Sequence, residues 1–413
     1  MTQPHDCKRT SRAALRAASA LLGLAGLGLG GLSPLHAATA QSVAQPPAPP
    51  PVLPVEDSDT ATLARPGAHW LWLFDPYRAQ GAVVVDGDDP AMKTMALVPA
   101  ARNAGMSLSR DGGKVYVAET YWSRGNRGTR EDLFTVYDGA SLKVDEEVAL
   151  PGRLLVVPKT QQQATSFDGK LGYIYDMVPS SAIHVVDIAS GKPVASIDVP
   201  GCALAFPIGA RGVATLCGDG SIGVAQVPVS GDPTVAFSDP FFDPDNDPVF
   251  ENSFVDRDTG KGWMLSFSGK VYPVDLAGAK PVVGQPWSIE VAAGQPEAGT
   301  GVQQLAWRPG GGQLLAVHRA RHWLYVLMHK GNFWTHKEDG SEVWVFNADT
   351  HALVRRIQLE TPAHGIAVTQ DDAPLLFAFG GGRGASLIAY DALSGKPVHH
   401  GALSGIIGLV TGL

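Results

Sequence analysis

Histidines gather in one stretch of this chain, where metal chemistry could occur. His318 and His322 lie four residues apart, and His329 and His336 follow within the same stretch. Two histidines four apart share a face only on a helix, whereas the surrounding sequence is rich in Pro and Gly and is typical of β structure. Because no carboxylate or cysteine completes a ligand set, we predict no metal site and expect a solvated or partner-facing loop.

Two further motifs suggest ligand chemistry by their letters alone. The run Asp243–Asp247 resembles the start of a calcium loop, but Pro248 stands where glycine is needed and Phe254 where the bidentate glutamate belongs. The run Gly218–Gly223 matches a dinucleotide fingerprint but opens no helix, so we interpret it as a turn. With no nucleophile elbow or protease motif, the sequence predicts no catalytic residue. It suggests a structural or recognition subunit whose chemistry lies on another chain.

A repeat along the chain predicts the elements of such a subunit. An apolar run ends in Asp or Asn, a small polar turn follows, and a second apolar run begins. Seven copies, one of them weak, end at Asp75, Asp138, Asp187, Gln226, Asp275, Asn347 and Asp391. Repeats of roughly 40–50 residues built from short strands are typical of a β-propeller. We therefore predict an all-β fold, a seven-bladed β-propeller, whose last strand shares a blade with strands of the N-terminal segment.

The inner strands of the blades are expected to form hairpins. Asp-Gly steps at Asp111 and Asp168 are strong hairpin signals between apolar runs. Two later hairpins of paired inner strands are expected within 304–317 and 365–378. Two long stretches, over 119–132 and 318–342, interrupt this rhythm. Long loops on a rigid scaffold are where binding surfaces commonly lie.

The composition and the N-terminus indicate an exported protein. The 413 residues are 45% hydrophobic and 17% charged, so a sizeable core can be buried, and 48 Gly and 31 Pro favour turns and short strands. Residues 1–40 are predicted to be a signal peptide, because basic residues precede an apolar stretch and Ala38–Ala40 fits a small-x-small cleavage site. A membrane anchor is the alternative, which the many Gly and Ala residues and the short length disfavour.

The remaining chain divides into two predicted parts. Residues 41–64 form a Pro-rich, disordered lead-in, and residues 65–413 form the propeller. The formal net charge of −8 argues against nucleic-acid binding. Once the signal peptide is cleaved, we expect no membrane association.

The interpretation of the cysteines depends on this export. Cys7 would leave with the signal peptide, which makes Cys202 and Cys217 the remaining pair in an oxidising compartment. A disulfide is the default interpretation, and closing its loop of about 15 residues would be worth roughly 3 kcal/mol on the chain-entropy model. Two free buried thiols are the alternative.

The arginine-rich stretch carries a family resemblance. The run 123–132, continuing to Asp138, resembles the heavy subunit of the tryptophan tryptophylquinone amine dehydrogenases, which are the methylamine and aromatic amine dehydrogenases of bacterial periplasms. The spacing of Cys202 and Cys217 is similar to the family's single disulfide hairpin, and Trp334–Lys337 resembles its sixth-blade insertion. The resemblance runs from about residue 65 to the C-terminus.

The resemblance implies a seven-bladed heavy chain in a heterotetramer of two heavy and two light subunits. The cofactor, tryptophan tryptophylquinone, would be made from two tryptophans of the partner light chain. No cofactor and no catalytic base are therefore expected on this chain. The assembly would oxidise primary amines to aldehyde and ammonia in the periplasm, and its electrons would pass to a blue copper protein that is amicyanin- or azurin-like.

The resemblance also implies residues that line a substrate channel. In the methylamine enzymes an aromatic gate follows an Asp-Pro step near the start of the propeller, and Asp75 and Pro76 match that step. Tyr77 is the nearest aromatic, but Ala79 stands at the gate position. We interpret the alanine as a widened channel suited to larger, aromatic amines.

The light-chain interface is expected on the arginine-rich loop. Exposed aromatic and Arg side chains are favoured at interface centres, which selects Tyr121, Trp122, Arg124, Arg127 and Arg130. In the alternative, the arginines pair with Glu131 and Asp132 and only order the loop.

Two other functions compete with this one. The chain could be a stand-alone periplasmic propeller that binds a protein or ligand without a redox partner. It could also be a propeller hydrolase such as a lactonase, which needs a central acidic metal site. The sequence contains no clear set of inward acidic ligands for such a site.

Overall fold

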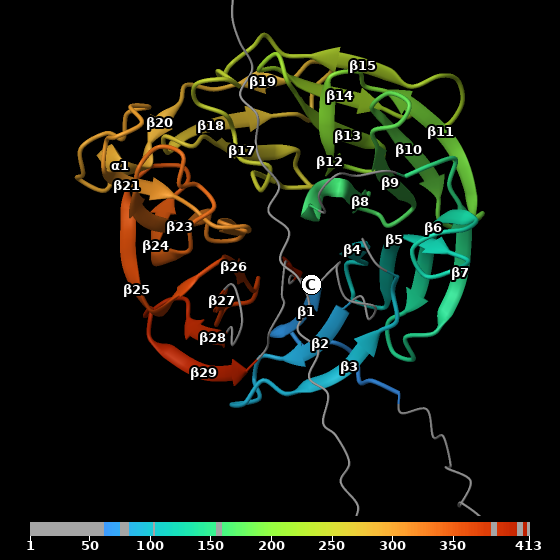
Figure 1. The fold of residues 1–413 in the computed structure, drawn as a ribbon, viewed down its shortest axis with the longest axis horizontal. Helices are drawn as coiled ribbons and strands as arrows, with labels where there is room; N and C mark the ends of the chain where they lie inside the picture. The colour runs from blue at the N-terminus through green and yellow to red at the C-terminus, as the bar shows by residue number, and fades with distance from the viewer. Residues whose placement is uncertain are drawn as a thin grey trace, which may run out of the picture. The chain divides into compact units, whose positions relative to one another are not determined.

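The computed structural model describes residues 62–74, 82–101, 104–153, 159–380, 386–402 and 408–410. These residues belong to one unit, Asp59–Leu413, and form seven antiparallel sheets arranged as a ring (Figure 1). The predicted all-β, seven-bladed propeller is therefore confirmed. The predicted signal peptide and almost all of the predicted lead-in lie outside the described residues, so their boundaries stay predictions.

Most blades consist of consecutive strands that run from the centre to the rim of the ring (Figure 1). Four blades follow this order simply: β4 (Gly105–Leu108), β5 (Lys114–Trp122), β6 (Arg130–Asp138), β7 (Val144–Ala149); β8 (Gln163–Thr165), β9 (Leu171–Asp176), β10 (Ala182–Asp187), β11 (Lys192–Asp198); β12 (Cys202–Ile208), β13 (Gly212–Cys217), β14 (Ile222–Gln226), β15 (Thr234–Phe237); and β26 (Gly365–Val368), β27 (Leu375–Phe379), β28 (Ser386–Asp391), β29 (Pro397–Ala402).

Two blades contain five strands. They comprise β16 (Phe254–Val255), β17 (Lys261–Leu265), β18 (Lys270–Asp275), β19 (Val282–Val283), β20 (Trp287–Ser288); and β21 (Ala306–Pro309), β22 (Leu315–His318), β23 (Trp323–Gly331), β24 (Gly340–Asn347), β25 (Leu353–Ala363). A short 3-10 helix, η1 (Thr160–Gln162), precedes β8, and the short helix α1 (Ile289–Ala292) follows β20. Within the described residues, no helix has the length and hydropathy needed to cross a membrane.

The seventh blade joins both ends of the propeller. Its strands are β1 (Trp70–Phe74), β2 (Ala82–Asp86), β3 (Thr94–Val98) and, innermost, β30 (Gly408–Val410). β30 pairs antiparallel with β1, so the expectation that the last strand shares a blade with the N-terminal segment is confirmed. This pairing closes the ring and covers the free inner edge of β1.

The sequence of β1 is apolar throughout because both of its faces are buried. Leu71 and Leu73 pack against the neighbouring blade of β26 to β29. Trp70, Trp72 and Phe74 point the other way, into the core shared with the blade of β4 to β7. Side chains alternate between the two faces of a strand, so a strand between two blades needs apolar residues at every position.

The repeated Asp and Asn residues end the third strand of a blade. Oδ1 of Asp138 accepts a hydrogen bond from the backbone N–H of Ser141 at 2.8 Å. In the same way, Oδ1 of Asp391 accepts one from the backbone N–H of Ser394 at 2.6 Å. Such side-chain bonds to the backbone fix the turn into the outer strand, which explains why the repeat marks blades.

One predicted copy of the repeat, at Asp75, is wrong. The apolar run before Asp75 is β1, the second strand of its blade, and the equivalent of the other copies is Asp86 at the end of β2. Oδ1 of Asp86 accepts a hydrogen bond from Asp88 N at 3.0 Å, as the repeat requires. The error arose because the inner strand of this blade comes from the C-terminus, so its first apolar run is already a second strand.

The predicted inner hairpins are confirmed in three blades. β4 pairs with β5, β8 with β9 and β26 with β27. The fourth expected pair is wrong, since β21 and β22 both pair with β23 rather than with each other.

Because neighbouring strands are antiparallel, their connections alternate between the two ends of the propeller. The end that carries the connections from second to third strands, including 123–129 and 332–339, is called the hairpin end. The end that carries the connections from first to second strands, including 109–113 and 256–260, is called the turn end.

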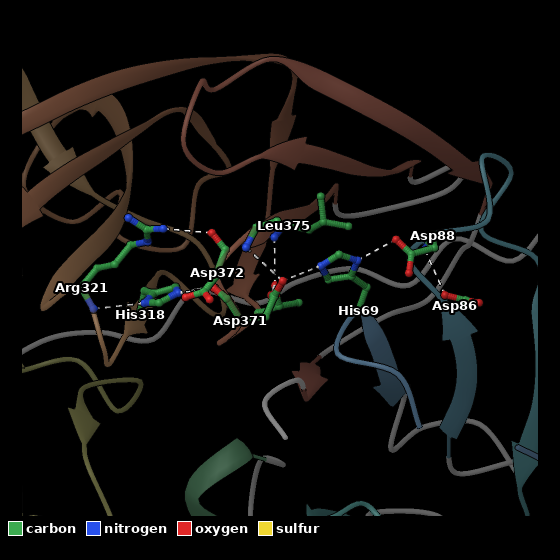
Figure 2. Close-up of polar contacts among 10 residues, drawn as sticks. His69, Asp86, Asp88, His318, Arg321, Asp371, Asp372 and Leu375 are labelled. Carbon is green, nitrogen blue, oxygen red and sulfur yellow. Dashed lines mark hydrogen bonds and ion pairs between the residues drawn. The ribbon is translucent and has the colours of Figure 1, made fainter. Parts of the chain in front are cut away.

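A histidine fastens the closing blade at the turn end. Nδ1 of His69 lies 2.6 Å from Oδ1 of Asp88, and its Nε2 lies 3.1 Å from Oδ2 of Asp371 in the adjacent blade (Figure 2). The backbone carbonyl of Asp371 accepts a hydrogen bond from His318 Nε2 at 2.9 Å. His69, Asp88 and Asp371 form what we call the histidine clasp, which links the two blades beside the chain closure.

Candidate functional site

The arginine-rich stretch is a long β-hairpin that ends at the hairpin end of the propeller. β5 and β6 pair over nine positions, up to Trp122 opposite Arg130, so much of the predicted loop is strand. The remaining tip, 123–129, is held by backbone bonds from Ser123 N to Thr129 O and from Arg124 N to Arg127 O, both 3.0 Å. The tip is therefore an ordered projection.

Buried polar contacts anchor the base of this hairpin. Glu119 is fully buried, and its carboxylate accepts hydrogen bonds from the N–H of Ala101 at 2.7 Å and from the hydroxyls of Tyr121 and Tyr137, each at 3.0 Å. Burial and the adjacent Glu119 charge raise the pKa of Tyr121 to about 12. Tyr121 thus stays a hydrogen-bond donor at neutral pH, and the buried carboxylate has the partners that it needs.

Three arginines of the hairpin have different surroundings. Nη2 of Arg130 lies 2.9 Å from Oδ1 of Asp132, and its guanidinium lies 5.8 Å from the ring centroid of Trp122. Arg124 and Arg127 are exposed, and neither makes an ion pair with any residue that the structure describes. The structure thus contains the predicted alternative, pairing with an acidic neighbour, for Arg130.

Exposed apolar side chains accompany the arginines at the hairpin end. Tyr121 and Trp122 are each 38% exposed. Connections of other blades at the same end add exposed aliphatic and aromatic side chains: Val178, Val302, Leu305 and Trp334. Aromatic and Arg residues together characterise protein–protein interfaces.

The second interrupting stretch forms another hairpin, between β23 and β24. Lys337 in its tip contacts Glu251 at 2.7 Å, and Lys159 contacts the same carboxylate oxygen. Burial would raise the pKa of Glu251, but the two lysines outweigh it and lower that pKa to about 2. This triad has no local signal in the sequence, because its members come from three separate connections.

The expectation of a solvated histidine loop is wrong for most of these histidines. His318 and His329 are buried, and the ring of His336 stacks on Phe267 at 4.0 Å. Burial lowers the pKa of His329 and of His336, which favours their neutral forms. His322 is exposed and pairs with Asp349. No group of three or more His, Cys, Asp or Glu suited to a metal occurs within the described residues.

The other sequence motifs have structural roles. Asp243 accepts hydrogen bonds from the N–H groups of Asp245 and Asn246, and Asp247 accepts them from the hydroxyls of Ser266 and Ser268. The run 218–221 connects β13 to β14, so it is the turn that the sequence predicted.

The predicted disulfide is confirmed. Cys202 and Cys217 form a disulfide between β12 and β13. The predicted channel residues, Tyr77 and Ala79, lie outside the described residues.

A central cavity of about 320 Å³ lies among the inner strands. Six blades line it, mainly with apolar, hydroxyl and amide side chains, and the charged residues of its lining are Arg257 and Arg319. The lining that the structure describes includes no carboxylate, so this cavity does not suit the central metal site of a propeller hydrolase.

Known proteins resemble this chain over most of its length. A family model described as "Methylamine dehydrogenase heavy chain (MADH)" matches residues 71–405. The methylamine dehydrogenase heavy chain of Methylobacillus flagellatus is 28% identical over 330 residues, which cover 79% of this chain and 80% of that protein. The same protein of Methylophilus methylotrophus is 27% identical, with coverage of 79% and 78%.

Solved structures share the fold at low sequence identity. The dihydro-heme d1 dehydrogenase NirN superimposes with a TM-score of 0.53 at 15% identity, covering 86% of this chain and 77% of that chain. A functionally unknown protein from Desulfotomaculum acetoxidans gives 0.54 at 12% identity, covering 83% and 98%. At these identities the likeness is one of fold alone.

Proposed function

Because the chain belongs to the methylamine dehydrogenase heavy-chain family, we propose that it is the non-catalytic heavy subunit of a periplasmic quinoprotein amine dehydrogenase. The family implies a light subunit as partner. In this proposal the propeller scaffolds the light subunit, which carries the quinone and the catalytic base. The assembly oxidises a primary amine to an aldehyde and ammonia.

The observation that carries this proposal is the hairpin end of the propeller. Trp122 and Tyr121 offer large, half-exposed side chains beside the cations of Arg124 and Arg127. The buried base around Glu119 makes the hairpin rigid, so little order has to be gained on binding. We place the light subunit on this end, against Tyr121, Trp122, Arg124, Arg127 and Arg130.

The charges of this end indicate the chemistry of the partner surface. Arg124 and Arg127 are exposed cations without ion pairs among the described residues. Acidic groups on the light subunit would complement them, and contacts between exposed charges mainly accelerate association at low salt. We therefore expect assembly to slow as the ionic strength rises.

Two pairs of neighbouring tryptophans in this chain are poor candidates for a quinone formed from two indole rings, because each pair has a buried member. The ring centroids of Trp70 and Trp72 are 6.3 Å apart, and those of Trp307 and Trp344 are 5.4 Å apart. Trp72 and Trp344 are buried within blade cores, where an amine substrate has no access. The burial of Trp72 and Trp344 supports placing the cofactor, whose role is to accept the electrons of the amine, on the light subunit.

The amine and the electron acceptor belong to the same proposal. Ala79 in place of an aromatic gate favours a wide channel, with Tyr77 beside it, and thus larger aromatic amines. Electrons would pass to an amicyanin- or azurin-like blue copper protein. Steady-state rates of the assembly on methylamine and on phenylethylamine test the width of the channel. A strong preference for methylamine would contradict a widened channel.

Co-expression of this chain with a light subunit tests the interface. We expect the wild-type chain to co-purify with the light subunit and to yield the visible absorbance of the quinone. Trp122→Ala removes a central aromatic anchor and should weaken association by about tenfold or more, because interface tryptophans often contribute 2 kcal/mol or more. Leu97→Ala, at an exposed position on the outer strand β3, is the control and should bind as the wild type does.

Unchanged co-purification of the Trp122→Ala chain would reject this interface. Amine oxidation by the isolated chain would reject the non-catalytic role itself. The competing function, a stand-alone periplasmic binding propeller, predicts that no light subunit co-purifies at all.

A further inference from the structure

Three arginines meet at the turn end of the central cavity, far from the proposed subunit interface along the axis of the propeller. Arg110 follows β4, Arg257 follows β16 and Arg319 follows β22, so each comes from the first turn of a different blade. Arg257 and Arg319 line the cavity. Arg110 lies against Phe167, 4.6 Å from its ring centroid, at the same end.

One carboxylate contacts these guanidinium groups within the described residues, and its contacts are loose. Oδ2 of Asp258 lies 3.6 Å from Nη2 of Arg110 and 4.0 Å from Nη1 of Arg319. Both distances exceed those of a hydrogen bond, which are about 2.7–3.2 Å. Neighbouring Asp256 directs its Oδ1 to the backbone N–H groups of its own turn. The arginines therefore retain free donors.

Of the three arginines, Arg257 has the fewest close acidic partners for its positive charge among the described residues. It reaches across the cavity and donates one long hydrogen bond, 3.5 Å, from Nη1 to the carbonyl of Leu108. A guanidinium has five N–H donors, and a partly buried cation is costly unless it is paired. Burial lowers the pKa of Arg257, as do the nearby charges of Arg319 and Arg110. An anion bound between the three guanidinium groups would offset the cost of burying the Arg257 cation and the repulsion from the positive charges of Arg319 and Arg110.

From this geometry we infer that the turn end of the central cavity binds a small oxyanion, a carboxylate or a phosphate, between Arg110, Arg257 and Arg319. Guanidinium groups match the planar or tetrahedral oxygens of these anions. The cavity volume of about 320 Å³ lies at the lower end of small-ligand sites. Low-dielectric walls around like charges concentrate the field, which attracts anions to this site although the whole chain has a formal net charge of −8.

Titration of the purified full-length chain with inorganic phosphate and with succinate, at constant ionic strength, tests the inference. We expect calorimetric binding of at least one anion and a matching rise in unfolding temperature. Tighter binding of phosphate identifies a phosphate site, and tighter binding of succinate identifies a carboxylate site. The absence of binding by both anions would overturn the inference.

Substitutions that should weaken anion binding, and one that should tighten it, locate the site. Arg257→Gln and Arg319→Gln should each weaken binding by about tenfold, the usual value of one charge-assisted hydrogen bond. Asp258→Asn removes the competing carboxylate and should tighten binding. Lys330→Gln, at an exposed position of β23 near the hairpin end, is the control and should bind as the wild type does.

Equal affinity of the wild type and the Arg319→Gln chain, or an equal loss of affinity in the Lys330→Gln chain, would contradict the site. If Arg257→Gln does not fold, the other two substitutions at the site still decide the outcome. The assay uses no light subunit, so its result is independent of the proposed amine dehydrogenase assembly.

Discussion

The three arginines of the β5–β6 hairpin differ in how much they contribute to the stability of the chain itself. Arg130 pairs with Asp132, whose side chain is largely buried. Its replacement would therefore disturb the hairpin as well as any interface. Arg124 and Arg127 are exposed and have no ion pair with a described residue. Substitutions there would report on binding alone, because surface side chains without partners contribute little to stability.

The two glycines of the tip provide a matched pair of substitutions. Both have left-handed backbones, with φ of +79° at Gly125 and +99° at Gly128. A Cβ at Gly125 would meet nothing within 4 Å, whereas one at Gly128 would lie 2.4 Å from Oγ of Ser123. That hydroxyl accepts the N–H of Thr129, so its displacement would open the tip.

We expect Gly128→Ala to weaken association with the light subunit more than Gly125→Ala. Both changes carry the backbone strain of about 1 kcal/mol for a left-handed alanine, and only the former adds the clash. Affinity measured by calorimetry on the two purified chains checks the difference. Equal affinities would show that the shape of the tip is irrelevant to assembly.

Strands and turns differ in how far the sequence predicts them. The Asp and Asn residues at third-strand ends identify the blades because each one bonds to the turn that follows it. β21 and β22 were mispaired because both strands align along the long β23, which a local hairpin pattern does not reveal. Likewise, the contact of Glu251 with Lys159 and Lys337 depends on connections that only the closed ring brings together.

The histidine clasp gives the closing blade a pH-dependent component of stability. Burial would lower the pKa of His69, but hydrogen bonds and charges of Asp88 and Asp371 outweigh it and raise that pKa. The unfolded value is about 6.5. A raised folded-state pKa means that the stabilisation is fully present below the unfolded pKa and is lost as the pH rises through the folded pKa.

We therefore expect His69→Gln to lower the unfolding temperature at pH 6 and to matter less at pH 8.5. The loss at pH 6 should be on the order of 1 kcal/mol, since the clasp is partly exposed to solvent. Thermal unfolding across this pH range measures it. His322→Gln is the control, because its pair with Asp349 is more than half exposed and should change little. If the fall in unfolding temperature caused by His69→Gln became larger as the pH rose, the proposed role of the histidine clasp would be contradicted.

At the scale of the whole molecule, one short strand closes the ring. The seven repeats in the sequence predicted the number of blades, and the apolar C-terminus predicted the shared blade. The three residue pairs between β1 and β30 make that closure. The opposite ends of the propeller then separate two surfaces, the aromatic and basic hairpin end and the arginines of the turn end.

Truncation after Ala402 should open the ring. The chain would lose β30 and expose the inner edge of β1, so we expect a fall in unfolding temperature on the order of 5 °C or more and a tendency to aggregate. Truncation after Val410 retains β30 and serves as the control. Calorimetry of both chains measures the effect, and equal unfolding temperatures would show that β30 is dispensable.

The shared blade also has a consequence for biosynthesis. The strands of six other blades lie between β3 and β30 in the chain, so the blade of β1 lacks its inner strand until those strands have been made. During that time its apolar inner edge is open to pairing with other nascent chains, and the long-range contact slows final folding. Chains that lack β30 would therefore keep an open strand edge and would be more prone to pair with one another than complete chains.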